Sequence, residues 1–259
     1  MKLQFKGYSY RFGWLSRLVT LVGVVVLMTL CFPLRWVSST LAQETNCKMV
    51  LSEPSGTIWE GKASLGFSDF KAGDSKTCNT PYAVIERFSW KSHCSLLNLQ
   101  CSWLIQQANL AQPLVLAVNF KGVTIQSNRA ELPGIVLEGA GSPWSSLHPR
   151  GKLKIQWNEL TWDSFPKGSF EIQFLEMASR ISPIQPLGSY ALKVQIDREL
   201  RFELFTLQGP LLLNGKGFLQ SGKLSFQGEA AASPESLDSL IGLLTIIGLR
   251  DGAVYRLNL

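Results

Sequence analysis

The sequence predicts a mainly β fold: an N-terminal transmembrane helix, a curved antiparallel β-sheet domain and a short C-terminal amphipathic helix. Three observations support this. An uncharged apolar run of 17 residues lies near the N-terminus. After residue 49, apolar residues alternate with polar ones along most of the chain, as in strands that bury one face. One stretch near the C-terminus has the apolar spacing of a helix. Both a sandwich-like and a roll-like arrangement of the sheet are consistent with the sequence.

The apolar run extends from Leu18 to Leu34, with an arginine on either side. A helix of this length reaches about 26 Å, enough to cross a thin bilayer, with Trp14 and Trp36 at its two interfaces. The predicted division of the chain is a cytoplasmic tail over 1–17, a transmembrane helix over 18–35, a linker over 36–48 and an exported β-rich domain over 49–259.

The basic residues at the N-terminus set the orientation of this helix. No acidic residue precedes Glu44, and the positive-inside bias keeps the tail in the cytoplasm. The formal net charge is +6, but after Arg17 the chain holds 21 basic and 19 acidic residues, a net of +2. Charge is therefore not concentrated on the folded domain, which argues against nucleic acid as a partner. The four basic residues of the tail are Lys2, Lys6, Arg11 and Arg17.

A cleaved signal peptide is the alternative for this segment. Thr40-Leu41-Ala42 has the small-x-small form that a signal peptidase accepts, directly before Gln43. The apolar run is longer than the usual 7–15 residues of a signal core. The sequence therefore favours a retained anchor, and the remainder is exported in either case.

The cysteines fit an oxidising compartment. Cys31 lies inside the apolar run, and the exported part holds four more, Cys47, Cys78, Cys94 and Cys101. Three pairings are open, and we favour the most local, Cys47–Cys78 with Cys94–Cys101. The second pair needs a turn between its members, because neither a straight helix nor a straight strand brings i and i+7 together. A zinc site is not favoured, because no CxxC motif occurs and His93 is the one histidine nearby.

Alternating segments in the exported part predict strands, separated by glycine or by Pro, Asp and Asn clusters. Their connections are too short for helical crossovers, which favours an antiparallel sheet. The alternating residues are Leu114 to Phe120, Leu153 to Trp157, Phe170 to Phe174, Tyr190 to Ile196, Leu200 to Leu204, Leu224 to Phe226 and Val254 to Leu259.

Two helices are predicted within this β pattern. A short one covers Ser95 to Gln100. The longer one runs from Ser233 to Gly248, with Ser233 as N-cap, Pro234 at the first helical position and Gly248 as the stop. Its apolar face is predicted to be Leu237, Leu240, Ile241 and Leu244, at i, i+3, i+4 and i+7. We expect this helix to close one end of the sheet core.

No catalytic, cofactor-binding or metal-binding constellation is predicted. His93 and His148 are the only histidines, and no HExxH, GxSxG, Walker or GxGxxG motif occurs in a fitting context. The carboxylates Glu159, Asp163, Glu171 and Glu176 are spread over predicted strand faces and turns, as solvated surface charges are. The sequence therefore favours a protein that is not an enzyme and needs no cofactor.

Several motifs resemble those of a known family, the type II secretion system protein N family (GspN). Ser55 to Gly61 reads SGTIWEG, which resembles the S-G-T-x-W-x-G segment near the start of that family. Phe88 to Lys91, followed by Leu96-Leu97, resembles its tryptophan strand and leucine pair. Pro186-Leu187-Gly188 before Tyr190 resembles its proline-leucine-glycine turn, and Leu243 to Gly248 its C-terminal helix. The landmark residues are Gly56, Trp59, Gly61, Trp90, Pro186, Leu187, Gly188, Tyr190 and Gly248. The cysteines of the exported part are a departure from the family pattern.

The resemblance implies an accessory protein of the bacterial cytoplasmic (inner) membrane, single-pass, with a periplasmic main domain. It would bind other secretion-system proteins and contact the membrane through residues 18–35. A second hypothesis is a periplasmic lipid-handling protein, in which Trp157, Phe170, Ile172 and Phe174 line an open groove and lipid is the partner. A third, an enzyme, needs convergent polar groups in a pocket.

Overall fold

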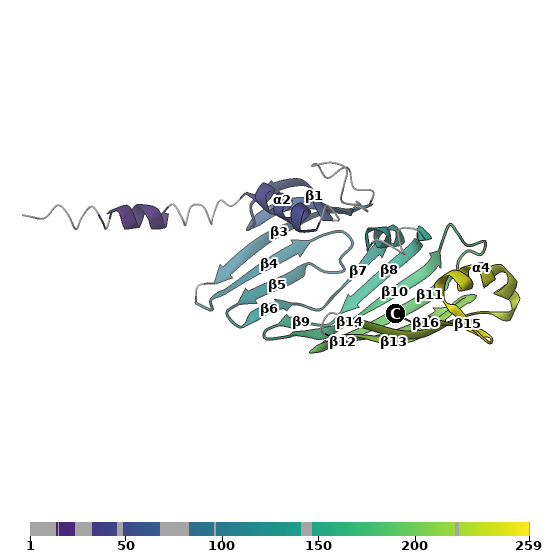
Figure 1. Cartoon of the computed structure of the whole chain (residues 1–259). Helices are drawn as coiled ribbons and strands as arrows, with labels where there is room; N and C mark the ends of the chain where they lie inside the picture. The colour runs from purple at the N-terminus through teal and green to yellow at the C-terminus, as the bar shows by residue number, and fades with distance from the viewer. Residues whose placement is uncertain are drawn as a thin grey trace, which may run out of the picture.

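The computed structural model of the chain describes residues 14, 16–23, 33–45, 49–67, 83–95, 97–140, 147–220 and 223–258 (Figure 1). In these ranges, 16 strands form one sheet in which every pair is antiparallel. The N-terminal part of the sheet consists of β1 (Met49–Gly56), β2 (Glu60–Phe67), β3 (Ala83–Ser95), β4 (Gln100–Gln106), β5 (Leu114–Asn119), β6 (Gly122–Ile125) and β9 (Leu160–Trp162). The C-terminal part consists of β7 (Asn128–Pro133), β8 (Arg150–Trp157), β10 (Pro166–Ala178), β11 (Gly188–Asp197), β12 (Glu199–Gln208), β13 (Leu211–Gln220), β14 (Lys223–Ala232), β15 (Leu249–Asp251) and β16 (Val254–Asn258).

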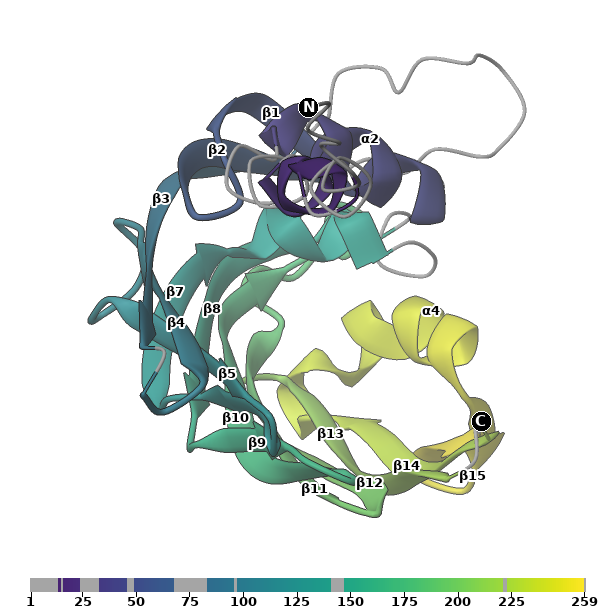
Figure 2. The same cartoon turned by 90° about the vertical axis from the view of Figure 1, so that its left-hand side faces the viewer.

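The long strand β10 joins the two parts. Its first residues pair with β9, which continues to β6, and its remainder pairs with β8. The predicted antiparallel sheet is confirmed, but it is one open curved sheet, neither a sandwich nor a roll (Figure 2). The reason is the connectivity: strands that follow one another in the chain are mostly neighbours in the sheet, so the described strands all join one layer.

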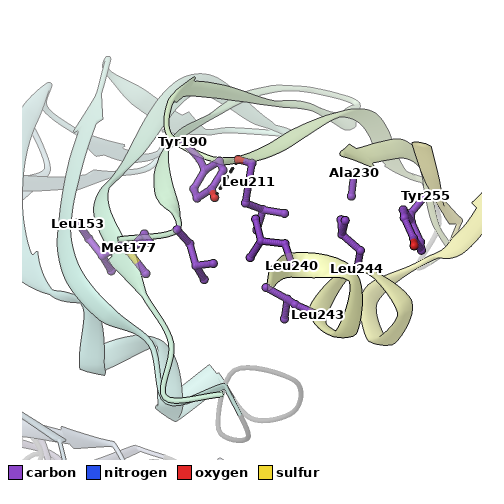
Figure 3. Packing of buried hydrophobic residues seen from close by; sticks show 10 residues of the cluster. Leu153, Met177, Tyr190, Leu211, Ala230, Leu240, Leu243, Leu244 and Tyr255 are labelled. Atoms are coloured by element: carbon purple, nitrogen blue, oxygen red, sulfur yellow. Dashed lines mark hydrogen bonds between the residues drawn. The ribbon is translucent and has the colours of Figure 1, made fainter. Parts of the chain in front are cut away.

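One face of the sheet is apolar from end to end. The register sets Phe170 opposite both Trp157 and Val194, and sets Phe202 opposite Val194 and Gly217. Because residues opposite each other share a face, the apolar positions of successive strands line up. The alternate positions carry mainly polar and charged side chains, among them Lys154, Lys193, Glu203 and Lys216. We call the apolar side the inner face, because α4 lies against it on the inside of the curve (Figures 2 and 3).

Helix α4 (Leu237–Ile247) covers one end of the inner face, after a 3-10 turn over Pro234–Ser236. As predicted, it ends at Gly248. The core beneath it unites residues from six strands with the helix (Figure 3): Leu153, Met177, Leu187, Tyr190, Leu211, Ala230, Leu240, Leu243, Leu244 and Tyr255.

The predicted apolar face of this helix is partly wrong. Leu240 and Leu244 are fully buried, and Leu243 joins them, whereas Leu237 and Ile241 are 40% and 42% exposed. Leucine and isoleucine also occupy the helix positions that face away from the sheet, so the 3.6-residue period alone could not decide which stripe is buried.

Helix α2 (Leu34–Glu44) occupies most of the segment predicted as a linker. Leu34, predicted as the end of the membrane run, is buried against Ala63 and Trp90 of the sheet. Among the described residues, 16–23 are helical, and no helix combines the length and apolarity needed to cross a membrane. Residues 24–32, the centre of the predicted span, lie outside the described ranges.

The short helix predicted over Ser95 to Gln100 is wrong. These two residues pair with each other across the β3–β4 hairpin, and Leu97–Leu99 form the turn. Cys94 pairs with Cys101 one position further along. Only four residues remain between the paired ends, which is too short for a helix and fits a hairpin turn.

Candidate functional site

A tryptophan cluster lies behind the SGTIWEG segment. The backbone carbonyl of Ile58 accepts hydrogen bonds from Trp90 Nε1 at 3.0 Å and from Trp103 Nε1 at 3.1 Å. The ring of Trp59 stacks on Trp103, with 6.0 Å between ring centroids. The turn that presents this carbonyl is held by Thr57 Oγ1, which accepts from the Trp59 and Glu60 amides. This segment thus ties the β1–β2 turn to β3 and β4.

The two glycines of the segment are required by close approaches. Gly56 has φ +94°, in the region that favours glycine. A Cβ on Gly61 would lie 2.6 Å from Cζ2 of Trp90. Both glycines therefore serve packing and chain direction, and neither is placed to bind a ligand.

The proline-leucine-glycine segment also builds the fold. Leu187 is buried in the core, and a Cβ on Gly188 would lie 2.8 Å from the Gln208 carbonyl oxygen. Tyr190 donates its hydroxyl proton to the Leu211 carbonyl at 3.2 Å (Figure 3). Burial raises the pKa of the Tyr190 hydroxyl well above its usual range. Pro186 is exposed and leads into this strand.

One of the expected disulfides is present. Cys94 and Cys101 are bonded, with their Cα atoms 4.0 Å apart, and they close the β3–β4 hairpin. Cys31, Cys47 and Cys78 lie outside the described residues, so the Cys47–Cys78 pairing stays a prediction.

The candidate catalytic groups do not converge. His148 Nδ1 lies 3.2 Å from Glu138 Oε1, and His93 lies on β3, far along the chain from that pair. Within the described ranges, no group of three or more His, Cys, Asp or Glu residues could hold a metal ion. Asp163 accepts hydrogen bonds from the backbone amides of Phe165 and Ser164 and from Lys167, which lower the pKa of its carboxyl. Its role is to hold its own turn.

The other carboxylates examined in the sequence are equally dispersed. Glu171 accepts a hydrogen bond from Gln173 at 2.8 Å, and Glu159 and Glu176 are exposed. Two depressions, of about 1080 and 660 Å³, lie mainly on the polar side of the sheet over β8 and β10–β14. They contain paired surface charges, such as Lys216 and Glu203 at 3.4 Å. This arrangement is typical of a solvated strand face.

The inner face beyond α4 is a different kind of surface. We call this part the uncovered strip; it comprises Trp157, Phe170, Val194, Phe202, Gly217 and Phe226. Phe202 and Phe226 stack nearly parallel, at 11° and 5.8 Å between centroids. They lie flat on the glycines of the strands beside them, since a Cβ on Gly215 would lie 2.5 Å from Cζ of Phe226. Most of these side chains are only half-buried.

The four residues predicted to line a groove do share this face. Phe174 packs against the core beneath α4, whereas Trp157, Phe170 and Ile172 stay half-buried outside it. The uncovered strip is therefore an open apolar surface, which is unusual because an apolar sheet face is normally covered.

A family model described as type II secretion system (T2SS), protein N, matches residues 48–258. The chain belongs to the type II secretion system protein N family. The match spans the whole sheet and α4, which confirms the resemblance seen in the motifs. Comparisons with curated proteins and with solved structures found no match.

Membership of the protein N family makes the chain a type II secretion component. The family-like landmarks at both ends of the chain serve the fold: Gly56, Trp59, Gly61 and Trp90 at the tryptophan cluster, and Leu187, Gly188, Tyr190 and Gly248 around the α4 core. They identify the scaffold without marking a binding site. The lipid-handling hypothesis had placed Trp157 and Phe170 on an open surface, whereas the part that Phe202 and Phe226 take in the strip was not predicted from the sequence.

Proposed function

We propose that this protein N family member is an accessory component of the secretion system that acts by binding other secretion proteins and catalyses no reaction. The observation that carries the proposal is the family match over residues 48–258. The dispersed polar groups of the described sheet support a binding role, because catalysis needs groups that converge on one point. The open apolar surfaces supply contact area of the kind that partners cover.

The proposed location is the bacterial cytoplasmic membrane, with a single pass and the β domain in the periplasm. Support comes from the run Leu18 to Leu34 and the basic tail before it. The Cys94–Cys101 disulfide fits an oxidising compartment. The inner membrane is also where a component of this family is expected.

Photocrosslinking in secreting cells tests the binding role. A photoreactive residue is placed in the full chain at Leu212, on the exposed polar side of β13, at Trp162, and at Ile246 on the outer side of α4. We expect at least one position to capture a protein of the secretion system, identified by mass spectrometry. Capture of no secretion protein from any position, with the chain present at its normal level, would contradict a binding role.

A second candidate function, lipid handling, is favoured by one observation: the half-buried aromatic surface of the uncovered strip. An acyl chain binds through apolar contact and needs no hydrogen-bonding partner. The apolar side chains of the strip supply contact of that kind. The test uses the full chain in vesicles containing a phospholipid with a photoreactive acyl terminus. Adducts on peptides that contain Phe170 or Phe202 would support lipid handling, and adducts confined to residues 18–35 would count against it.

A further inference from the structure

Several hairpin turns lie together at one end of the sheet. Because strand direction alternates along the sheet order, the turns β1–β2, β3–β4, β5–β6, β9–β10, β11–β12 and β13–β14 all fall at the same end. We call this the hairpin end. It is opposite the end that α4 covers (Figure 1).

The hairpin end exposes large apolar side chains at positions where turns usually carry polar residues. Leu97 is 97% exposed, Phe120 is 76% exposed and Trp162 is 63% exposed. Leu99, Phe165 and Leu224 are also exposed at the same turns. At the opposite end, the β12–β13 turn consists of Gly209 and Pro210. Exposed large apolar residues occur there too, in the β10–β11 connection, beside the β12–β13 turn, on α4 and directly after it: Ile181, Leu207, Leu212, Ile246 and Leu249.

Basic residues stand beside these apolar ones. Lys121 Nζ lies 5.7 Å from the ring centroid of Phe120. Lys167 is two residues after Phe165 and forms an ion pair with Asp163 at 3.2 Å, and Lys223 directly precedes Leu224. Aromatic rings and aliphatic side chains next to lysines are typical of protein surfaces at the headgroup level of a bilayer, where the apolar part enters and the ammonium stays in water.

The chain also enters the β domain at this end. Pro33 forms a β-bridge with Thr57 in the β1–β2 turn. Pro33 and Leu34 are the last two residues of the apolar run, so the remainder of the run directly precedes this point. Helix α2 then leads away along the sheet before β1 returns. A membrane crossed by the run would therefore lie next to the hairpin end.

We propose that the hairpin end is a membrane-contact surface, and that the β domain stands with this end on the periplasmic leaflet of the cytoplasmic membrane. The proposal rests on the membrane attachment proposed above. The occupant is the headgroup and upper acyl layer of phospholipid. Phe120, Trp162 and Phe165 enter this layer, and Lys121 and Lys223 stay among the phosphates.

The uncovered strip supports a lipid surface over a protein partner. Phe170, Phe202 and Phe226 of the strip lie in the halves of their strands nearer the hairpin end, whereas the α4 core lies at the other end. Between the turns and the strip, the described inner face carries an apolar row, in which Ile196 pairs with Leu200 and Leu219 pairs with Leu224. The β11–β12 turn itself is charged, with Asp197 and Glu199 on either side of Arg198. Rings that lie flat on glycines present few holes for the ridges of a partner helix, but they suit fluid chains.

The test is site-specific photocrosslinking of the full chain in vesicles of phosphatidylethanolamine and phosphatidylglycerol. p-Benzoylphenylalanine replaces Phe120 or Phe165, and in the control it replaces Ile246 on α4. Ile246 is 73% exposed, close to the 76% of Phe120, but it lies toward the opposite end. Mass spectrometry measures the fraction of protein that carries a lipid adduct, and flotation of the vesicles measures membrane attachment.

We expect the chain to float with the vesicles and the lipid adduct to be severalfold more abundant at Phe120 and Phe165 than at Ile246. Equal yields at the three positions in a floating chain would overturn the membrane contact and leave attachment intact. Adducts that join two copies of the chain at Phe120 would likewise overturn it and assign the surface to self-association. If the chain does not float with the vesicles, the proposed membrane attachment is wrong. The proposed membrane contact of the hairpin end is then wrong as well.

Discussion

The indole Nε1 of Trp103 donates a hydrogen bond to the backbone carbonyl of Ile58, 45 positions away in the chain, at 3.1 Å. The same carbonyl accepts a second bond from Trp90. Each indole can therefore be lost while the other still satisfies the oxygen. Loss of both leaves a partly buried acceptor without either protein donor.

This shared acceptor predicts a coupling between the two tryptophans. Trp90→Phe and Trp103→Phe should each cost about 1 kcal/mol for the lost hydrogen bond, in addition to lost ring packing. The double variant should cost about 1 kcal/mol more than the sum, because only then is the carbonyl left unpaired. Denaturant unfolding of the four proteins measures this. Additive costs would show that the two bonds act independently.

A pair of glycine substitutions tests the packing behind the SGTIWEG segment. Gly61→Ala should destabilise the fold by about 2 kcal/mol or more, since its Cβ would press on the Trp90 ring. Gly242→Ala is the matched control: apart from its chain neighbours and the backbone of α4 itself, nothing lies within 4 Å of its Cβ position. That change should stabilise by about 0.5–1 kcal/mol through helix propensity. Thermal unfolding gives both values, and a neutral Gly61→Ala would refute the contact.

The Cys94–Cys101 disulfide should contribute measurable stability. Closing a loop this short restricts the unfolded chain by about 2.5 kcal/mol in the chain-entropy treatment. The double substitution Cys94→Ser with Cys101→Ser should therefore lower the melting temperature. A reductant should lower the melting temperature of the native chain toward that of the variant and leave the variant itself unchanged. Equal melting temperatures without reductant would contradict this contribution.

Tyr190 predicts a specific response to alkaline pH. Burial raises the pKa of its hydroxyl in the folded protein, whereas in the unfolded chain the group ionises near pH 10. Its contribution to stability is therefore complete below pH 10 and is lost as the pH rises further. Tyr190→Phe should cost about 1 kcal/mol at pH 7 through the bond to Leu211. Above pH 10, the stability of the Tyr190→Phe variant should decline less steeply with pH than that of the native protein. Denaturant unfolding at a series of pH values measures this. Parallel stability curves for the two proteins would show that Tyr190 does not cause the alkaline loss of stability.

The sequence predicted the class of the fold well, because period-two alternation is a local signal. The strands around Phe170, Tyr190 and Phe202 and the stop of α4 at Gly248 were all readable from spacing. The short helix over Ser95 to Gln100 failed because the Cys94–Cys101 register left room only for a turn. The prediction of which face of α4 is buried was partly wrong, because apolar residues occupy more than one side of that helix.

The candidate surfaces were less predictable because they depend on tertiary contacts. Phe202 looks like a core residue in the sequence, but it lies outside the cluster that α4 covers and is only half-buried. Leu97 and Phe120 do carry a local signal, since large apolar residues are uncommon in turns. Their gathering at one end with Thr57 follows from the order of the strands.

The most direct test of the central claim is the distribution of a folded secreted protein between medium and periplasm in cells that lack this chain. If the chain is a secretion component, the secreted protein should accumulate in the periplasm of the deletion strain. Expression of the full chain should return that protein to the medium. Normal amounts of cargo in the medium of the deletion strain, under conditions in which the wild-type strain depends on type II secretion, would contradict the claim.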